Sequence, residues 1–306
     1  MEKLCELTDV SMFYGQTLAL NRVGIHVRRG EIVGLLGANG AGKTTLMELL
    51  EGLLLPSSGS VAVLGKPPAQ LTPQERGDIG LMFQRYALPG YSQVAEFVDL
   101  YASLYPHENG ADLIARLGLG QFLKKRIGSL SAGQQQRLAF FCAVYGRQGL
   151  LILDEPTSAL DVRSRRAMRE LLVERCRTHR LGVLLSTHEL EDAAALCDRI
   201  YILDHGEIKL DATSEQLRQM NRGSLRFEFS APESVTKTLQ AALNGGASVP
   251  LSLAQGRWKV ECDHDAAAQF LDHLLRAETE HGFVSGVQVS SGKLEDIYLD
   301  TISHEH

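Results

Sequence analysis

The feature that most constrains the fold of this chain is a glycine-rich segment, residues 37–44 (GANGAGKT), placed between an apolar run and a helical pattern. The apolar run covers residues 31–36 and the helical pattern covers 43–54. This arrangement matches G-x-x-x-x-G-K-[ST] in the strand-to-helix context that the motif requires. Glycines let several backbone N–H groups converge on one anion, and the following helix directs its positive end at the same point. The alternative is a glycine-rich turn that happens to precede a helix, but it would have to match the motif at every defined position.

The segment predicts a site for a nucleotide and for Mg²⁺, although it names no function by itself, because many NTPase classes share it. Lys43 is expected to reach the β- and γ-phosphates, and the Thr44 hydroxyl is expected to bind the metal ion. The predicted nucleotide contacts in this segment are Gly37, Asn39, Gly40, Ala41, Gly42, Lys43, Thr44 and Thr45.

A second apolar run, Leu150–Leu153, ends in two acidic residues, Asp154 and Glu155, followed by Pro156. A buried strand of this kind delivers its terminal residues to the carboxyl edge of a parallel sheet, where the phosphate loop also lies. Successive side chains on a strand diverge, so the two carboxylates can take different roles. Asp154 is expected to hold Mg²⁺ through water, and Glu155 to polarise the attacking water. A polar strand end closed by proline is the alternative, and the phosphate loop upstream makes us favour the catalytic pair.

Continuous apolar runs alternate with helical patterns through the first two thirds of the chain, which is typical of strands buried on both faces of a parallel sheet. The sequence therefore predicts an α/β core. Short strands and turns are predicted before residue 30, and a helix-rich region over Ser92–Arg126. The predicted strands are Cys5–Val10, a strand ending at Arg29–Gly30, Ser60–Leu64, Ile79–Phe83, Leu150–Leu153 and Gly182–Leu185.

The character of the chain changes near residues 221–224, where a small α+β unit begins. Its predicted order is βαββαβ with a terminal helix, as in ferredoxin-like domains. The predicted elements are the strand Ser224–Ser230, the helix Glu233–Leu243, the strands Val249–Leu253 and Arg257–Cys262, the helix Ala266–Ala277, the strand Phe283–Ser290 and the helix Leu294–Thr301.

Charge and composition limit the partners and the cellular compartment that we expect for this NTPase. The net charge of −6 argues against a general nucleic-acid binder, which normally carries a basic footprint, so we expect no nucleic-acid partner. The five cysteines are scattered without metal-ligand spacing, which favours reduced thiols in the cytoplasm. The first ten residues carry charges where a secretory signal has an apolar core, and no apolar run approaches the ~20 residues needed to cross a bilayer. A role at the membrane would therefore have to be exercised through partners.

Residues 130–134 (LSAGQ) resemble the LSGGQ signature motif of ABC ATPases. Ser131 and Gln134 also form a capping box for the helix that follows, and both interpretations can hold. In the family this serine-capped helix start reaches the γ-phosphate of ATP held by the opposite subunit, so Ser131, Gly133 and Gln134 are expected to contact that nucleotide. Ala132 departs from the usual glycine, and we expect this extra methyl group to weaken closure of the dimer rather than abolish it.

Further family positions occur in the expected order. Tyr14 resembles the aromatic residue that stacks on adenine, and Gln84 resembles the glutamine that senses Mg²⁺ and links to membrane subunits. Residues 158–161 (SALD), ending in Asp161, resemble the D-loop that crosses the dimer interface, and His188 resembles the histidine that contacts the γ-phosphate. Each residue alone would be an ordinary packing, surface or capping residue.

The resemblance covers roughly residues 2–220 and implies a P-loop NTPase core with an antiparallel β subdomain and a helical subdomain at about 85–147. Residues 1–220 are expected to form the ATPase domain, and 221–306 a small α+β domain for dimerisation or regulation. The implied catalytic residues are Glu155, His188 and Gln84, and the implied metal ligands are Thr44, Gln84 and Asp154. The implied cofactors are ATP and Mg²⁺, and the implied partners are a second copy of the chain and integral-membrane transporter subunits, with the chain peripheral on the inner face of the cell membrane.

The direction of transport is predicted from the end of the chain. Residues 294–299 (LEDIYL) resemble the ending of ATPases that serve drug, lipid and polysaccharide exporters, which favours export; an ordinary surface helix is the alternative. An importer subunit and an ABC ATPase without a transporter stay open as rival interpretations. A non-catalytic regulator is disfavoured because every catalytic position carries a competent residue.

Overall fold

The computed structural model describes residues 2–83, 88–105, 110–146, 148–221, 225–232, 251–254, 257–262, 267, 270–274 and 285–291. The chain folds into two compact units, Met1–Ser214 and Glu215–His306. The predicted boundary after residue 220 and the predicted role of the smaller domain remain predictions.

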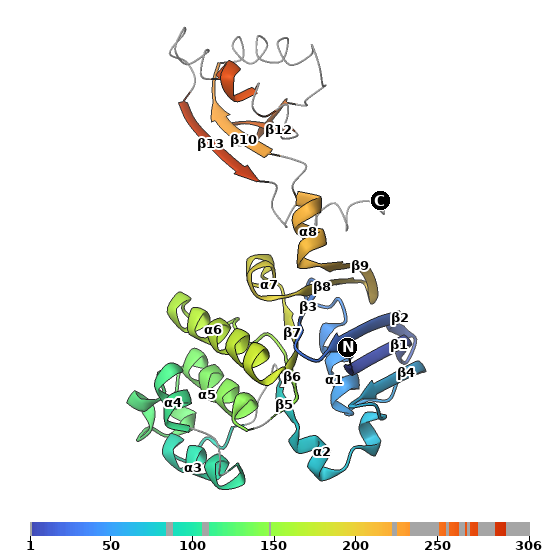
Figure 1. Cartoon of the computed structure of the whole chain (residues 1–306), viewed down its shortest axis with the longest axis vertical. Helices are drawn as coiled ribbons and strands as arrows, with labels where there is room; N and C mark the ends of the chain where they lie inside the picture. The colour runs from blue at the N-terminus through green and yellow to red at the C-terminus, as the bar shows by residue number, and fades with distance from the viewer. Residues whose placement is uncertain are drawn as a thin grey trace. The chain divides into compact units, whose positions relative to one another are not determined.

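A six-stranded sheet forms the centre of the first unit (Figure 1). Its strand order is β5-β6-β7-β3-β8-β9; β9 runs antiparallel to β8, and the other neighbours are parallel. Every residue of β3, β6 and β7 is buried, which explains why β3, β6 and the first four residues of β7 form continuous apolar runs. The strands are β3 (Ile32–Leu36), β5 (Ile79–Met82), β6 (Leu150–Leu153), β7 (Gly182–Thr187), β8 (Arg199–Asp204) and β9 (Glu207–Thr213).

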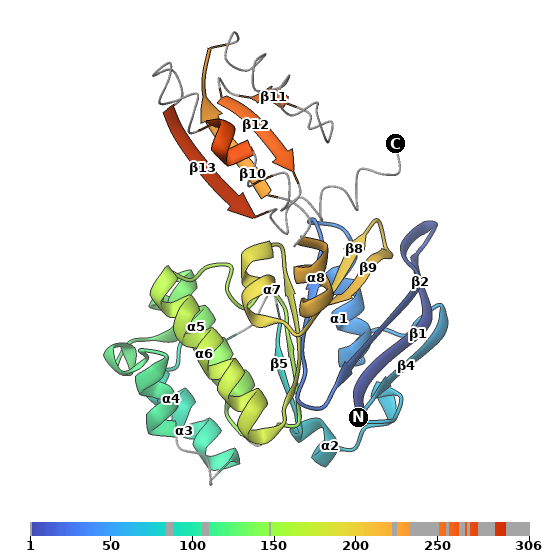
Figure 2. The ribbon, with the colours of Figure 1, turned by 45° about the horizontal axis from the view of Figure 1, so that its top comes forward.

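A second, antiparallel sheet of order β2-β1-β4 packs beside the first with helix α1 (Lys43–Glu51) between them (Figure 2). Its strands are β1 (Lys3–Tyr14), β2 (Thr17–Arg28) and β4 (Ser58–Val63). One hydrophobic core joins these layers: side chains of β1, β2 and β4 pack with Leu46 and Leu50 of α1 and with Leu35 and Ile152 of the central sheet. Burial of these apolar side chains holds α1, and the loop before it, in a fixed place.

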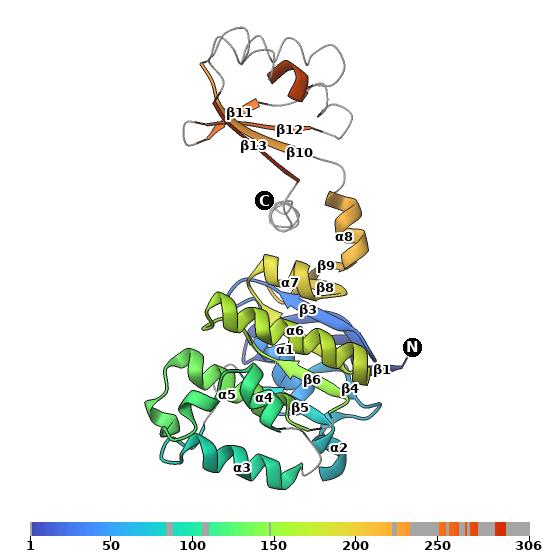
Figure 3. The ribbon, with the colours of Figure 1, turned by 60° about the vertical axis from the view of Figure 1, so that its left-hand side comes forward.

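Helices α5 and α6 and the short α7 lie on the opposite side of the central sheet from α1 (Figures 1 and 2). Helices α3 and α4 extend beyond α5, away from the antiparallel sheet (Figure 3). The helices of the first unit after α1 are α2 (Pro73–Gly77), α3 (Val94–Leu104), α4 (Gly110–Arg116), α5 (Ala132–Val144), α6 (Val162–His179) and α7 (Leu190–Leu196), with 3₁₀ turns at Pro68–Gln70, Gly120–Phe122 and Ile127–Ser129. Helix α8 (Ser214–Asn221) follows β9.

The second unit contains an antiparallel sheet of order β11-β12-β10-β13, with a helical turn at 270–274 on one face (Figure 3). The ring centroid of Phe270 lies 4.9 Å from that of Phe227 and 6.0 Å from that of Phe229, and all three side chains are buried. This strand order is that of a ferredoxin-like unit, as predicted. The strands are β10 (Leu225–Ser230), β11 (Leu251–Ala254), β12 (Arg257–Cys262) and β13 (Ser285–Ser291). The predicted helices Glu233–Leu243 and Leu294–Thr301 lie outside the described residues.

The predicted fold class is confirmed, and the differences lie in the strand limits and in two strands that were not predicted. The first strands are much longer than predicted, because β1 and β2 pair over 12 residues each with register shifts that interrupt simple alternation. Strands β8 and β9 were not predicted at all. Within the described part of the chain, no helix has both the length and the apolarity that crossing a bilayer requires.

Candidate nucleotide-binding site

The glycine-rich loop connects the end of β3 to the start of α1 and lies tightly against its surroundings. A Cβ atom on Gly37 would come within 2.4 Å of the carbonyl oxygen of Leu203, so only glycine fits there without a backbone shift. Gly40 and Gly42 have φ angles of 86° and 109°, which side-chain-bearing residues rarely adopt. The loop therefore exposes its backbone N–H groups because its glycines permit both the curvature and the close approach.

Lys43, the first residue of α1, lies across this loop with 7% of its surface exposed. Its Nζ donates hydrogen bonds to the carbonyl oxygens of Gly37 at 2.8 Å and Ala38 at 3.1 Å, and lies 3.9 Å from Oε1 of Glu155. Burial lowers the pKa of the ammonium group, while the Glu155 and Asp154 carboxylates oppose this shift. The loop carbonyls hold the cation where a phosphate chain would contact it.

Asp154 lies at the end of β6 and is only 4% exposed. The hydroxyl of Thr44 donates to its Oδ2 at 3.2 Å, and the hydroxyl of Ser186, on the neighbouring strand β7, donates to its Oδ1. The described residues contain no cluster of three or more histidine, cysteine or acidic side chains that could cage a metal. One carboxylate beside one hydroxyl is nevertheless the donor set with which Mg²⁺ is held together with phosphate oxygens and water, so the residues present fit this ion.

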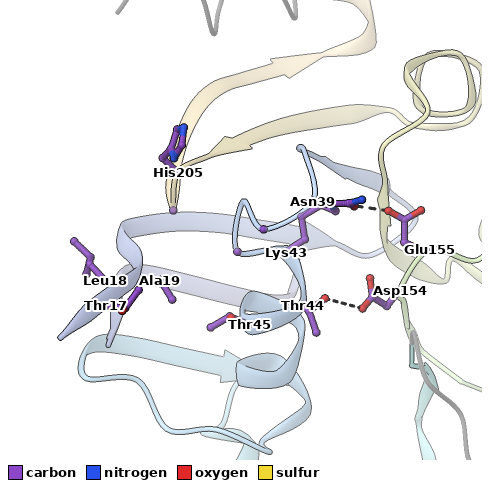
Figure 4. Close-up of a pocket in the computed structure, with 13 residues that line it drawn as sticks. Thr17, Leu18, Ala19, Asn39, Lys43, Thr44, Thr45, Asp154, Glu155 and His205 are labelled. Atoms are coloured by element: carbon purple, nitrogen blue, oxygen red, sulfur yellow. Dashed lines mark hydrogen bonds and ion pairs between the residues drawn. The ribbon is translucent and has the colours of Figure 1, made fainter. Parts of the chain in front are cut away.

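Glu155 projects its carboxylate into the same region from the next position (Figure 4). His188, just beyond the end of β7, contacts it with Nδ1 3.0 Å from Oε1 and 2.9 Å from Oε2. Because an ionised carboxylate only accepts hydrogen bonds, the histidine proton in this pair lies on Nδ1. The Glu155 side chain is 11% exposed and that of His188 is 52% exposed, so the pair reaches from the protein interior to its surface.

Lys43, Thr44, Asp154 and Glu155 line one pocket of about 450 Å³ (Figure 4), whereas His188 contacts Glu155 from outside this lining. Lys43 and Thr44 face Glu155 and Asp154 across it. Its lining residues are Thr17, Leu18, Ala19, Asn39, Gly40, Gly42, Lys43, Thr44, Thr45, Asp154, Glu155, His205 and Gly206. Five of them were missed from sequence: Thr17, Leu18 and Ala19 on β2, and His205 and Gly206 in the β8–β9 turn. No local pattern marks them, because they reach the pocket through the packing of β2 and the β8–β9 turn against the loop, where Gly206 N donates to Ala41 O at 3.0 Å.

Comparison with known proteins identifies this arrangement. Residues 20–158 match the family described as ABC transporter. The aliphatic sulfonates import ATP-binding protein SsuB of Escherichia coli K12 is 35% identical over 234 residues, 76% of this chain and 90% of that protein. SsuB of Shigella flexneri is 34% identical over 250 residues, 82% of this chain and 95% of that protein. The chain belongs to the ABC transporter family. It is an ATP-binding subunit of that family and hydrolyses ATP.

Solved ABC structures agree with this assignment. An ATP-binding subunit of an ABC transporter superposes with a TM-score of 0.64 at 30% identity, covering 71% of this chain and 92% of that one. A dimeric ATP-binding cassette in a post-hydrolysis state, bound to ADP and phosphate, superposes with a TM-score of 0.61 at 25% identity, covering 69% of this chain and 98% of that one. ABC ATP-binding subunits dimerise and work with membrane transporter subunits. The named relatives are import proteins, so they do not support the export direction predicted from residues 294–299, which lie outside the described part of the chain.

Four predicted ABC site residues lie at helix starts outside the lining of this pocket. Ser131 caps α5: its hydroxyl accepts from Gln134 N at 3.3 Å, while Gln134 Oε1 accepts from Ser131 N at 3.1 Å. Asp161 caps α6 by accepting from Ser164 N at 2.9 Å, a hydrogen bond that lowers the pKa of its carboxyl. Ser131, Gly133, Gln134 and Asp161 are absent from the pocket lining, and their contact with the nucleotide of a second subunit stays a prediction.

Two other predicted contact residues are Tyr14 and Gln84. Tyr14 ends β1 at the turn into β2, with 47% of its surface exposed, and it too is absent from the pocket lining. Its stacking on adenine stays a prediction. Gln84 lies outside the described residues, so its predicted roles in catalysis and in metal binding stay predictions as well.

Proposed function

We propose that this chain powers a transporter as a homodimer that binds two ATP molecules, each between the phosphate loop of one copy and the Ser131–Gly133 segment of the other. One observation carries the proposal: Lys43, Thr44, Asp154 and Glu155 converge on one pocket. The exposed, serine-capped start of α5 supports the dimer, because a helix start of this kind is a ready anion site that its own pocket does not use.

The chemistry follows from the positions of these groups. When a triphosphate enters, Lys43 exchanges its bonds to Gly37 and Ala38 for phosphate oxygens. A magnesium ion held by Thr44 and Asp154 would supply charge neutralisation on the β- and γ-phosphates. Glu155 accepts a proton from water as the water oxygen bonds to the γ-phosphorus and the bond to the bridging β-oxygen breaks, which yields ADP and phosphate. His188 orients the Glu155 carboxylate before ATP arrives and is free to turn to the γ-phosphate because half of its side chain is exposed.

The helical region beyond β5 is the proposed docking surface for membrane subunits. Large apolar side chains stand exposed here: Tyr91 is 94% exposed, Leu104 63% and Leu100 53%. Exposed apolar groups gathered in one region are typical of a protein–protein contact. Through this contact, we place the chain at the inner face of a cell membrane. Co-purification of the chain with a membrane protein encoded beside it, lost when Tyr91 and Leu104 are replaced by Ser, tests the docking surface.

For the direction of transport we propose import, which the names of the similar SsuB proteins support. Export is the second candidate, favoured only by residues 294–299. Right-side-out and inside-out vesicles that contain the chain with its membrane subunits separate the two: ATP supplied on the side of this chain should move cargo toward that side for import and away from it for export.

The second unit, built around the β10–β13 sheet, is proposed to assist dimerisation or regulation. The SsuB matches cover up to 95% of those proteins but at most 82% of this chain, so the ATPase works in relatives that are shorter. Removal of the residues after Asn221 should then leave ATP binding intact and change dimerisation or coupled turnover. Unchanged dimerisation and unchanged coupled turnover would reject this role. Trp258, whose Nε1 donates to Ala231 O at 2.9 Å, is a fluorescence probe for the folding of this unit.

A further inference from the structure

The backbone of Glu155 adopts a left-handed conformation, with φ at 48°. For a residue with a side chain this conformation is energetically unfavourable. It persists only where the surroundings hold both peptide groups. On one side, Glu155 N donates to the hydroxyl of Ser186 at 2.8 Å. The direction of the Glu155 carboxylate therefore depends on whatever holds the carbonyl group on the other side.

That carbonyl group accepts hydrogen bonds from the side chain of Gln136, one turn into α5, and, within its own segment, from the hydroxyl and N–H groups of Ser158 at 3.2 and 3.4 Å. Gln136 is 3% exposed, and its Nε2 donates to Glu155 O at 2.7 Å and to the hydroxyl of Ser158 at 3.4 Å. Its Oε1 accepts from Ala159 N at 2.9 Å. A buried primary amide thus has its oxygen and its nitrogen engaged by one short segment, 155–159. Leaving any of these groups unpaired in the interior would destabilise the folded state.

The same face of α5 contacts this segment one turn earlier. A Cβ atom on Gly133 would come within 2.6 Å of Ala159 O, so the first turn of the helix is in close contact with the segment. Residues three apart lie on one face of a helix, and this is the separation of Gly133 and Gln136. The first turns of α5 therefore form the surface on which segment 155–159 rests.

We propose that Gln136 is a positioning residue for ATP hydrolysis: it holds the Glu155 backbone in its left-handed conformation from the helix whose start faces the partner's nucleotide. The inference rests on the proposed role of Glu155 as the base. Of the described residues that line the pocket, Gln136 hydrogen-bonds only to Glu155, so it acts on proton transfer and leaves nucleotide binding alone. Engagement of Ser131 at one ATP is thereby linked, through the first turns of a single helix, to the base at the other.

The test compares Gln136→Met, which keeps the side-chain length without the hydrogen bonds, with Gln148→Met. Gln148 donates to Tyr145 O at 2.8 Å beyond the far end of α5 and is a matched control. Single-turnover ATP hydrolysis and ATP affinity are measured on the full-length chain, alone and combined with Glu155→Gln. For Gln136→Met we expect turnover to fall about 10- to 100-fold, as for a misplaced catalytic group. ATP affinity should be unchanged, Gln148→Met should behave as wild type, and Gln136→Met should cause no further loss in the Glu155→Gln background.

Wild-type turnover in Gln136→Met would overturn the inference, as would a parallel loss of ATP affinity. An equal fold loss in the wild-type and Glu155→Gln backgrounds would also overturn it, because a purely structural residue acts regardless of the base. If Gln136→Met does not fold, Gln136→Asn, which retains the amide on a shorter stem, is measured in the same cycle against the same outcomes. Absence of hydrolysis in the wild-type chain would instead count against the proposed function itself.

Discussion

Nδ1 of His188 lies 2.9 Å from Oε2 of Glu155, although the two residues are 33 positions apart in the chain. They meet because β6 and β7 are parallel neighbours whose carboxyl ends lie side by side. The Glu155 carboxylate, which only accepts hydrogen bonds, lies beside the phosphate loop. Its donor is the His188 ring, which is exposed and can therefore move. A carboxylate in this position is suited to accept the proton of an attacking water.

Glu155→Gln should bind ATP but lose turnover by about 10²–10⁴-fold, because the amide keeps the shape of the side chain and cannot accept the proton from water. ATP should then hold the closed dimer, which a sizing column detects. Glu207→Gln, on β9 and outside the pocket lining, is the control and should behave as wild type. Turnover at the wild-type rate would remove Glu155 from the role of base.

Lys43→Ala should weaken ATP affinity by at least ~10-fold, because charge-assisted bonds to the phosphates are lost. Equilibrium binding of a fluorescent ATP analogue measures the change. Lys66→Ala removes an exposed lysine that pairs with Glu75 at 2.7 Å, and it should bind ATP normally. Equal affinity in the two variants would show that Lys43 is no phosphate ligand.

Two replacements of Ser131 separate its capping role from its proposed contact with the partner's nucleotide. Ser131→Ala removes the hydroxyl that accepts from Gln134 N and should lower stability by about 1 kcal/mol. Ser131→Asp keeps a good N-cap and should retain the wild-type melting temperature. Its carboxylate repels a phosphate, however, so the ATP-dependent dimer should not form. If Ser131→Asp dimerises with ATP as the wild type does, capping is the whole role of the residue.

Glu51, the last residue of α1, should make stability depend on pH. Burial, with the nearby Asp154 and Glu48 carboxylates, raises the pKa of its carboxyl from 4.5 to about 7. Its Oε2 has no hydrogen-bond partner within the described residues, and a negative charge at a helix C-terminus is unfavourable. A raised folded-state pKa of an acid means that stability is fully present below pH 4.5, falls as pH rises towards 7, and falls no further above it.

Glu51→Gln stays neutral, so it should match the wild type near pH 4.5 and exceed it at pH 8. The expected gain at pH 8 is on the order of 1–2 kcal/mol, seen as a higher Tm in thermal melts at the two pH values. Glu170→Gln, which removes an exposed carboxylate of α6, should show no such pH-dependent gain. A Tm difference that is the same at both pH values would contradict the assignment to Glu51.

The sequence by itself determined the chemistry of the site and the type of fold. The loop 37–44 and the strand that ends at Asp154 and Glu155 could be recognised because a phosphate cradle needs fixed glycine positions, and because a strand buried on both faces must be continuously apolar. The ferredoxin-like strand order of the second unit was likewise predictable from its alternation of element types.

Tertiary packing alone decided which other residues join the loop 37–44, Asp154 and Glu155 at the site. Leu18 and His205 line the pocket, and Gln136 and Ser186 hold the peptide groups of Glu155, yet none of them stands in a pattern that predicts this. Gln136 lies just after the motif at residues 130–134, but from the sequence alone it could have been any buried helix residue. Contacts of this kind depend on how β2, β7 and α5 lie against β6, which is set by burial of apolar area across the whole unit rather than by local spacing. Local sequence specifies the reacting groups, and only the packed core specifies what holds them in place.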